Sequence, residues 1–111
     1  MENKKIAEEA FNYFNSGYNC AEAVLKSITD NFSSEKNEAI LRIASPFCGG
    51  IGKTTKEICG ALSGGIMAIG YLYGRSKPGE NFDAAWKMTA KLRTEFEEKW
   101  GTTQCGSILK E

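Results

Sequence analysis

The feature that most constrains this chain is a run of 17 residues without a charge, from Ile58 to Gly74. A membrane-spanning helix needs about 20 predominantly apolar residues, and this run is shorter and rich in glycine. Isoleucine and leucine recur in it at helical spacing, with glycine and alanine between them. Because each glycine inside a helix costs about 1 kcal/mol relative to alanine, close packing has to offset the glycines. The run therefore predicts a buried central helix.

This central helix is expected from about residue 55 to residue 74, preceded by a glycine-rich turn. Thr54 and Glu57 have the spacing of a capping box, and Thr55 is a rival N-cap. Gly60 and Gly64 are four residues apart and share one helix face, where they allow another backbone to approach.

Apolar spacing predicts further helices over residues 2–15, 19–32, 34–45 and 82–100. Gly17 and Gly101 suit the positions just after two of these helices. Asn19 and Glu22 form a variant of the capping box at the start of the second helix.

The ends of the other predicted elements depend on single residues. Pro46 is expected to end the third helix, because the residue before a proline is disfavoured in the α region. Asn81 is the expected cap of the last helix. After it, Thr102 and Thr103 are candidate caps of a short turn, which Ile108 and Leu109 would dock.

The predicted class is all-α, a four- or five-helix bundle in a single domain over residues 1–111, since no long stretch alternates as a strand would. Acidic and basic residues number 14 each, which gives no positive excess for binding nucleic acid or a membrane surface. The charged N-terminal stretch has no apolar segment typical of a signal peptide. We therefore expect a cytoplasmic protein, in which thiols stay reduced.

Cysteine is the residue type most suited to reactive chemistry here, because the chain contains no histidine. The four cysteines are Cys20, Cys48, Cys59 and Cys105. Each is predicted near the start of a helix, where the helix dipole favours a thiolate and lowers the thiol pKa. Because helix starts can converge at one end of a bundle, we expect at least three sulfurs to meet at one site.

Three motifs resemble the redox-active family that is named for its pattern, C_GCAxxG_C_C. They are GYNCAEAV at residues 17–24, FCGGIG at 47–52 with CGALSG at 59–64, and Cys105 followed by GSIL. The central block reads Cys-Gly-Ala where the family name has Gly-Cys-Ala. The resemblance implies a small helical redox protein. More distantly, it implies a likeness to the N-terminal domain of split-Soret cytochrome c, in which a helical bundle is associated with an iron–sulfur centre.

Three classes of function follow. In a redox protein, Cys20, Cys59 and Cys105 would cycle between dithiol and disulfide with an unknown redox partner. Alternatively, all four cysteines would hold an iron–sulfur cluster for electron transfer, with Gly49 and Gly50 lining it.

The other two classes use the cysteines without turnover. Four thiolates can hold a structural zinc ion, and a helical interaction module with inert cysteines would form a homodimer through an amphipathic helix. No set of acid–base residues indicates a self-contained enzyme.

Overall fold

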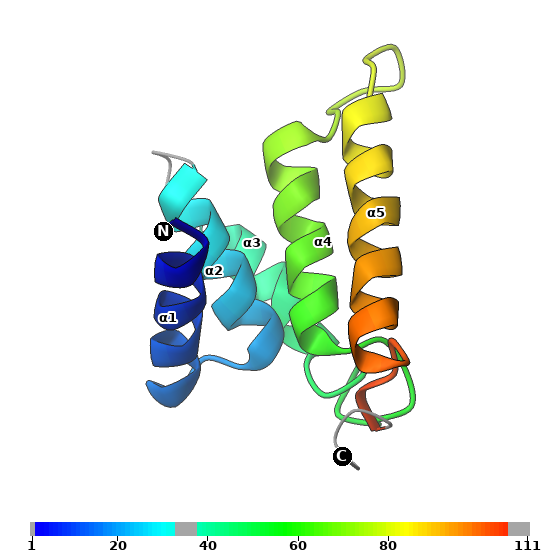
Figure 1. Cartoon of the computed structure of the whole chain (residues 1–111). Coiled ribbons are helices and arrows are strands. Elements are labelled where there is room, and N and C mark those ends of the chain that lie inside the picture. Colours follow the sequence, from blue (N-terminus) through cyan, green and yellow to red (C-terminus); the bar gives the residue numbers. More distant parts are fainter. Residues whose placement is uncertain (1, 33–37, 107–111) are drawn as a thin grey trace.

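The computed structural model describes residues 2–32 and 38–106, which are all-α as predicted (Figure 1). The elements in chain order are α1 (Glu2–Asn15), α2 (Cys20–Phe32), α3 (Glu38–Ala44), the 3-10 helix η1 (Ser45–Phe47), α4 (Gly60–Tyr73) and α5 (Asp83–Trp100). Within these described ranges the only β-type pairing is an isolated antiparallel bridge between Ile58 and Gln104. No helix of the described part is long and apolar enough to cross a membrane.

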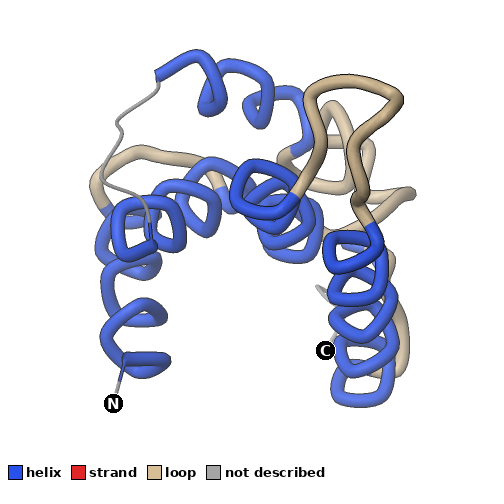
Figure 2. The backbone as a smooth tube through the Cα atoms, turned by 90° about the horizontal axis from the view of Figure 1, so that it is seen from above, coloured by secondary structure: helices blue, strands red, loops and turns tan. Residues whose placement is uncertain are grey.

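Helices α2 and α4 form the centre of the molecule and pack on each other more extensively than any other pair. Helix α1 packs mainly on α2, whereas α5 packs mainly on α4, so the two outer helices stand on opposite sides (Figure 1). Seen from above, the helices follow an arch (Figure 2). The small buried core lies around Ala21 and Leu25 of α2, Ala44 of α3 and Ala68 of α4.

Glycine explains why α2 and α4 approach closely. A Cβ added to Gly64 would lie 2.5 Å from the backbone oxygen of Ala21, which is too close for any side chain. Ala21 itself is completely buried. The predicted role of Gly64 as a point of backbone approach is therefore confirmed.

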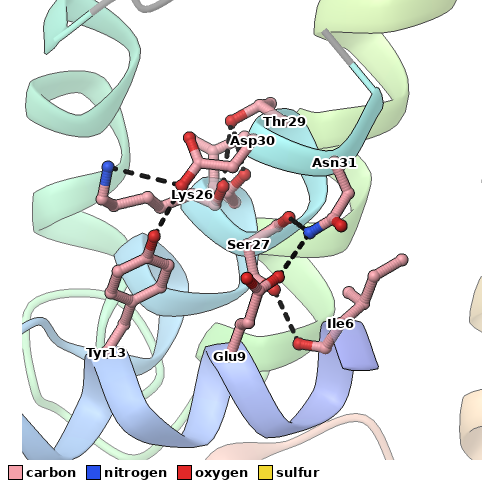
Figure 3. A network of polar contacts seen from close by, with 9 residues as sticks. Ile6, Glu9, Tyr13, Lys26, Ser27, Thr29, Asp30 and Asn31 are labelled. Carbon is pink, nitrogen blue, oxygen red and sulfur yellow. Dashed lines mark hydrogen bonds and ion pairs between the residues drawn. The ribbon is translucent and has the colours of Figure 1, made fainter. Parts of the chain in front are cut away.

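Polar contacts hold α1 against α2 (Figure 3). The Ser27 hydroxyl donates to the backbone oxygen of Ile6 at 2.6 Å, so this buried serine is satisfied. The Tyr13 hydroxyl donates to Asp30 Oδ2 at 2.6 Å. These bonds fix the register of α1 on α2, and none of the α1 residues whose burial is described belongs to the core cluster.

The predicted helix ends are confirmed in most places. Gly17 and Gly101 adopt the left-handed conformation, with φ of 118° and 77°, which glycine adopts without strain. At the start of α5, the Asp83 N–H donates to Asn81 Oδ1 at 2.8 Å, although Phe82 occupies the N-cap position.

The predicted start of the central helix is wrong. Helix α4 begins at Gly60 rather than near residue 55, and the capping box of Thr54 and Glu57 does not form. The Thr54 hydroxyl instead donates to the backbone oxygen of Gly50 at 2.7 Å, because the preceding segment folds back on itself. Residues 48–59 therefore form a loop.

The third helix also differs from its prediction. Helix α3 covers Glu38–Ala44, and Pro46 lies inside the 3-10 helix that follows rather than just after an α-helix. Proline fits there because the first positions of a helix do not use its missing N–H. Residues 34–37 of the predicted helix lie outside the described residues, as do Ile108 and Leu109.

Candidate functional site: four cysteines at one end of the helices

The first turn of α2 positions Cys20. The backbone N–H of Asn19 donates to Glu22 Oε1 at 3.0 Å, and the N–H of Glu22 donates to Asn19 Oδ1 at 2.9 Å. This is the reciprocal capping box that the sequence predicts. Ser45 ties the box to the next element, because its hydroxyl donates to Glu22 Oε2 and its carbonyl accepts from Asn19 Nδ2 at 3.2 Å. Cys20 thus begins a helix whose end is held on both sides.

The start of α4 brings a second cysteine to the same place. Cys59 is the N-cap of α4, and Gly60 is the first residue of the helix. A Cβ on Gly60 would overlap Cys20 Sγ, so the sulfur occupies the space that glycine leaves open. Cys20 and Cys59 are both half-buried.

A left-handed turn leads from Cys48 back toward this site. Five consecutive residues, 49–53, have φ between 59° and 76°. The Lys53 N–H donates to the Cys48 carbonyl at 3.0 Å, and the Thr55 N–H donates to the Gly49 carbonyl at 2.8 Å. For Ile51 and Lys53 this conformation costs roughly 1–2 kcal/mol each. Backbone strain of this kind concentrates at functional sites.

The segment after α5 docks on the segment before α4 through three backbone hydrogen bonds. Cys59 N–H donates to the Thr103 carbonyl at 2.7 Å, Cys105 N–H to the Glu57 carbonyl at 2.8 Å, and Gly106 N–H to the Thr55 carbonyl at 2.7 Å. Cys59 and Cys105 each follow a partner of the bridge between Ile58 and Gln104. Cys59 and Cys105 therefore flank this bridge, and each backbone N–H bonds to a carbonyl two residues before the other cysteine.

Glycine also makes room for Cys105. A Cβ on Gly50 would lie 2.9 Å from Cys105 Cβ and 2.9 Å from the Cα of Thr55. Gly50 is buried and has a φ of 76°, so both its conformation and its surroundings require glycine. Cys48 and Cys105 are buried, with 9% and 7% of their surface exposed.

The electrostatics show that all four thiols share one neighbourhood. Burial raises the pKa of the Cys105 thiol above its ordinary value, and negative charge on Cys59, Cys20 and Cys48 raises it further, in that order. A thiolate at Cys105 is therefore disfavoured while its neighbours are charged. For this cysteine the expected lowering of the thiol pKa by a helix dipole is wrong, because burial and like charge outweigh the dipole.

Cys48 does not lie at a helix start, which corrects a further expectation. It follows η1 at its C-terminal end, with an extended backbone, and 10 residues separate it from Cys59. Among residues 2–32 and 38–106, no three cysteine or acidic side chains are grouped so that they could hold a metal ion.

Fold and site together define a small all-α protein with four cysteines at one end of its helices. The family model described as "Putative redox-active protein (C_GCAxxG_C_C)" matches residues 18–111, and the chain belongs to this family. No curated protein and no solved structure matches the chain.

Gly60 belongs to the site, although the sequence motifs indicated it only indirectly. The prediction of a close backbone approach is met by Ala21 N, 3.3 Å from a Cβ on Gly60, and the contact with a cysteine sulfur comes in addition. The Cys-Gly-Ala order of the central motif carries this signal, because it places a glycine directly after Cys59. The docking of residues 103–106 had no local signal.

Proposed function

We propose that this protein transfers electrons by thiol–disulfide exchange, with Cys59 and Cys105 as the working pair. The observation that carries the proposal is the backbone pairing of residues 57–59 with 103–105, in which the Cys59 N–H donates to the Thr103 carbonyl and the Cys105 N–H donates to the Glu57 carbonyl. Of the three neighbouring thiols, Cys59 also has the largest electrostatic effect on Cys105. The family's description as redox-active supports this class of function.

The burial of the two cysteines suggests the order of the steps in the exchange reaction. Cys59 is half-buried and Cys105 is buried, so the Cys59 thiolate attacks the disulfide of a partner and releases one partner thiolate. The mixed disulfide removes the negative charge of Cys59, and one cause of the raised pKa of Cys105 disappears with it. Cys105 then loses its proton to solvent and attacks the Cys59 sulfur. The partner leaves as a dithiol, carrying two electrons.

Closure of the disulfide needs the Cα atoms of Cys59 and Cys105 within about 7 Å of each other. The bonds of the two cysteine N–H groups to the Thr103 and Glu57 carbonyls keep the two backbones side by side for this step. Cys20 lies against Gly60, the residue next to Cys59.

A second candidate is an iron–sulfur protein, and the gathering of all four thiols around Cys105 favours it. Four thiolates are the usual ligand set of such clusters, and a cluster is larger than a single ion, so its ligands stand further apart. Cys20, Cys48, Cys59 and Cys105 would hold the group, which supplies one-electron transfer. Gly49 and Gly50 would leave space beside it.

We also propose a redox partner protein and a location in the cytoplasm, where thiols stay reduced. The deciding experiment is purification without oxygen, followed by a visible spectrum and measurement of iron and sulfide. A colourless protein in which mild oxidation protects two thiols from alkylation supports the exchange mechanism. In that case Cys59→Ser and Cys105→Ser abolish the protection, whereas Cys48→Ser keeps it. Visible absorption with iron and sulfide, lost when any one of the four cysteines is replaced by serine, would instead establish a cluster.

A further inference from the structure

The concave side of the arch carries two adjoining apolar grooves. The larger, of about 550 Å³, lies between α2, α4 and α5, and the smaller, of about 400 Å³, lies between α1 and α2. Both share Val24, Ile28 and Phe32 of α2. The only charged side chains that line either groove are Lys91 and Glu95, among the described residues.

Large apolar side chains of the grooves are exposed to solvent. Phe32, Tyr73 and Met88, which line the larger groove, are each more than 40% exposed. An occupant of the grooves is therefore expected.

The charges of α5 indicate which occupant fits. The stretch from Lys87 to Arg93 is basic and the stretch from Glu95 to Glu98 is acidic, while Asp83 in the first turn and Lys99 in the last turn carry the opposite charges. A copy of α5 that runs antiparallel places each basic part beside the acidic part of the other. The net charge of the chain is zero, so two copies do not repel each other overall.

The apolar side chains of α5 have the same symmetry. Met88, Leu92 and Phe96 line the larger groove at a spacing of four residues, with Leu92 in the middle. In an antiparallel pair centred on Leu92, Met88 of each copy meets Phe96 of the other. Lys91 and Glu95 form only a long ion pair of 3.9 Å with side chains 78% and 59% exposed, so both remain available to a partner helix.

We propose that two copies of this chain form a homodimer around a two-fold axis through α5 near Leu92, with each α5 lying in the concave side of the other copy. The arrangement covers the apolar grooves and completes the packing of α5, which within one copy rests mainly on α4. It also puts the two cysteine sites at opposite ends of the α5 pair, because each site follows the C-terminal end of its own α5. The dimer does not depend on the redox mechanism.

The test measures the mass of the full chain in solution by sedimentation equilibrium, with reductant present so that no disulfide links the copies. We expect twice the chain mass of 12.2 kDa. Met88→Glu should raise the dimer dissociation constant at least about tenfold, as loss of a central apolar contact does. Thr94→Glu adds the same charge on a different, exposed face of α5 and should leave the dissociation constant unchanged.

Exchanging the charges of Lys91 and Glu95 shows whether α5 contacts a second copy of itself or a different partner. Lys91→Glu alone places like charges together and should weaken the dimer, whereas the double variant Lys91→Glu with Glu95→Lys should restore it. Circular dichroism shows whether each variant remains folded. A folded wild-type chain that is monomeric at all concentrations, or a dimer that Met88→Glu and Thr94→Glu affect equally, would overturn the proposal.

Discussion

The sulfur of Cys20 occupies the space that Gly60 leaves by having no side chain. One contact therefore joins the starts of α2 and α4 and sets where two of the four thiols lie. The same kind of fit recurs where Gly50 leaves room for Cys105. The glycines of this chain thus shape the site directly, in addition to shaping its turns.

Replacement of Gly60 tests this relationship. Gly60→Ala should displace Cys20 or the start of α4 and destabilise the fold by about 1–3 kcal/mol, as overpacking does. It should also change the rate at which Cys20 is alkylated. Gly70→Ala, in the same helix but with nothing within 4 Å of the new Cβ, should be neutral or stabilising by up to about 1 kcal/mol. Denaturant unfolding and thiol mass mapping of both variants provide the measurement. Equal behaviour of the two variants would contradict the contact.

The crossing of α2 and α4 gives a second prediction. Gly64→Ala places a methyl group 2.5 Å from the Ala21 carbonyl, and since backbone cannot move aside as a flexible side chain can, we expect a loss of about 2 kcal/mol or more in unfolding free energy. Gly70→Ala again serves as the matched control. An unchanged denaturant midpoint for Gly64→Ala would show that the helices separate at little cost.

The left-handed turn gives a third prediction. Ile51 has a φ of 65° and is 42% exposed, so Ile51→Gly removes strain and loses little packing. We expect a gain of roughly 1 kcal/mol in unfolding free energy. Gly52→Ala, at a φ of 63° with open space around the new Cβ, should lose a similar amount through strain alone. Thermal unfolding of the two variants should therefore shift in opposite directions.

Tyr13 gives a pH-dependent prediction. Its hydrogen bond to Asp30, then burial, then the charge of Asp30 raise the pKa of Tyr13 from 10.0 to about 12. Because the pKa is raised by folding, this stability is fully present below pH 10.0 and is lost as the pH rises through about 12. Tyr13→Phe should cost about 1 kcal/mol at neutral pH. Tyr71→Phe is the control, since its hydroxyl makes no hydrogen bond within the described residues. Ultraviolet titration of tyrosinate in the wild type and Tyr13→Phe measures the shift.

Cys105 gives a related prediction near the site. Burial and the neighbouring thiolates raise its pKa above 9.0, so the unfolded chain releases this proton first as the pH rises. The stability that the protonated thiol contributes is complete below pH 9.0 and declines as the pH rises through the folded-state pKa. Cys105→Ala should therefore show a shallower loss of unfolding free energy above pH 9.0 than Cys48→Ala. Parallel pH profiles for the two variants would argue against the raised pKa.

Local signals predicted much of this fold because they act within a few residues. The capping box of Asn19 and Glu22 and the left-handed glycine after α5 are found as predicted. Thr54 and Glu57 have the same spacing as that box, yet they form no cap. The backbone carbonyl of Glu57 instead accepts a hydrogen bond from the Cys105 N–H, which pairs two segments nearly 50 positions apart. A local pattern could not reveal that competing, long-range contact.

The site itself was predictable only in part, for the same reason. Motif order indicated which cysteines to consider, but their burial and the raised pKa of Cys105 depend on the packing of the loop and the segment after α5. The left-handed backbone at Ile51, Lys53 and Thr55 contradicts the ordinary preferences of these residues. Tertiary hydrogen bonds outweigh those preferences here.

The docking of residues 103–106 on residues 55–59 has a consequence for the synthesis of the protein. Cys20 leaves the ribosome 85 positions before Cys105, and α2 can form on its own signals at once. The four thiols can gather only after Gly106 has emerged and its backbone has paired with Thr55. A nascent or truncated chain therefore has helices but no assembled site, so this chemistry belongs only to molecules whose translation has passed that point.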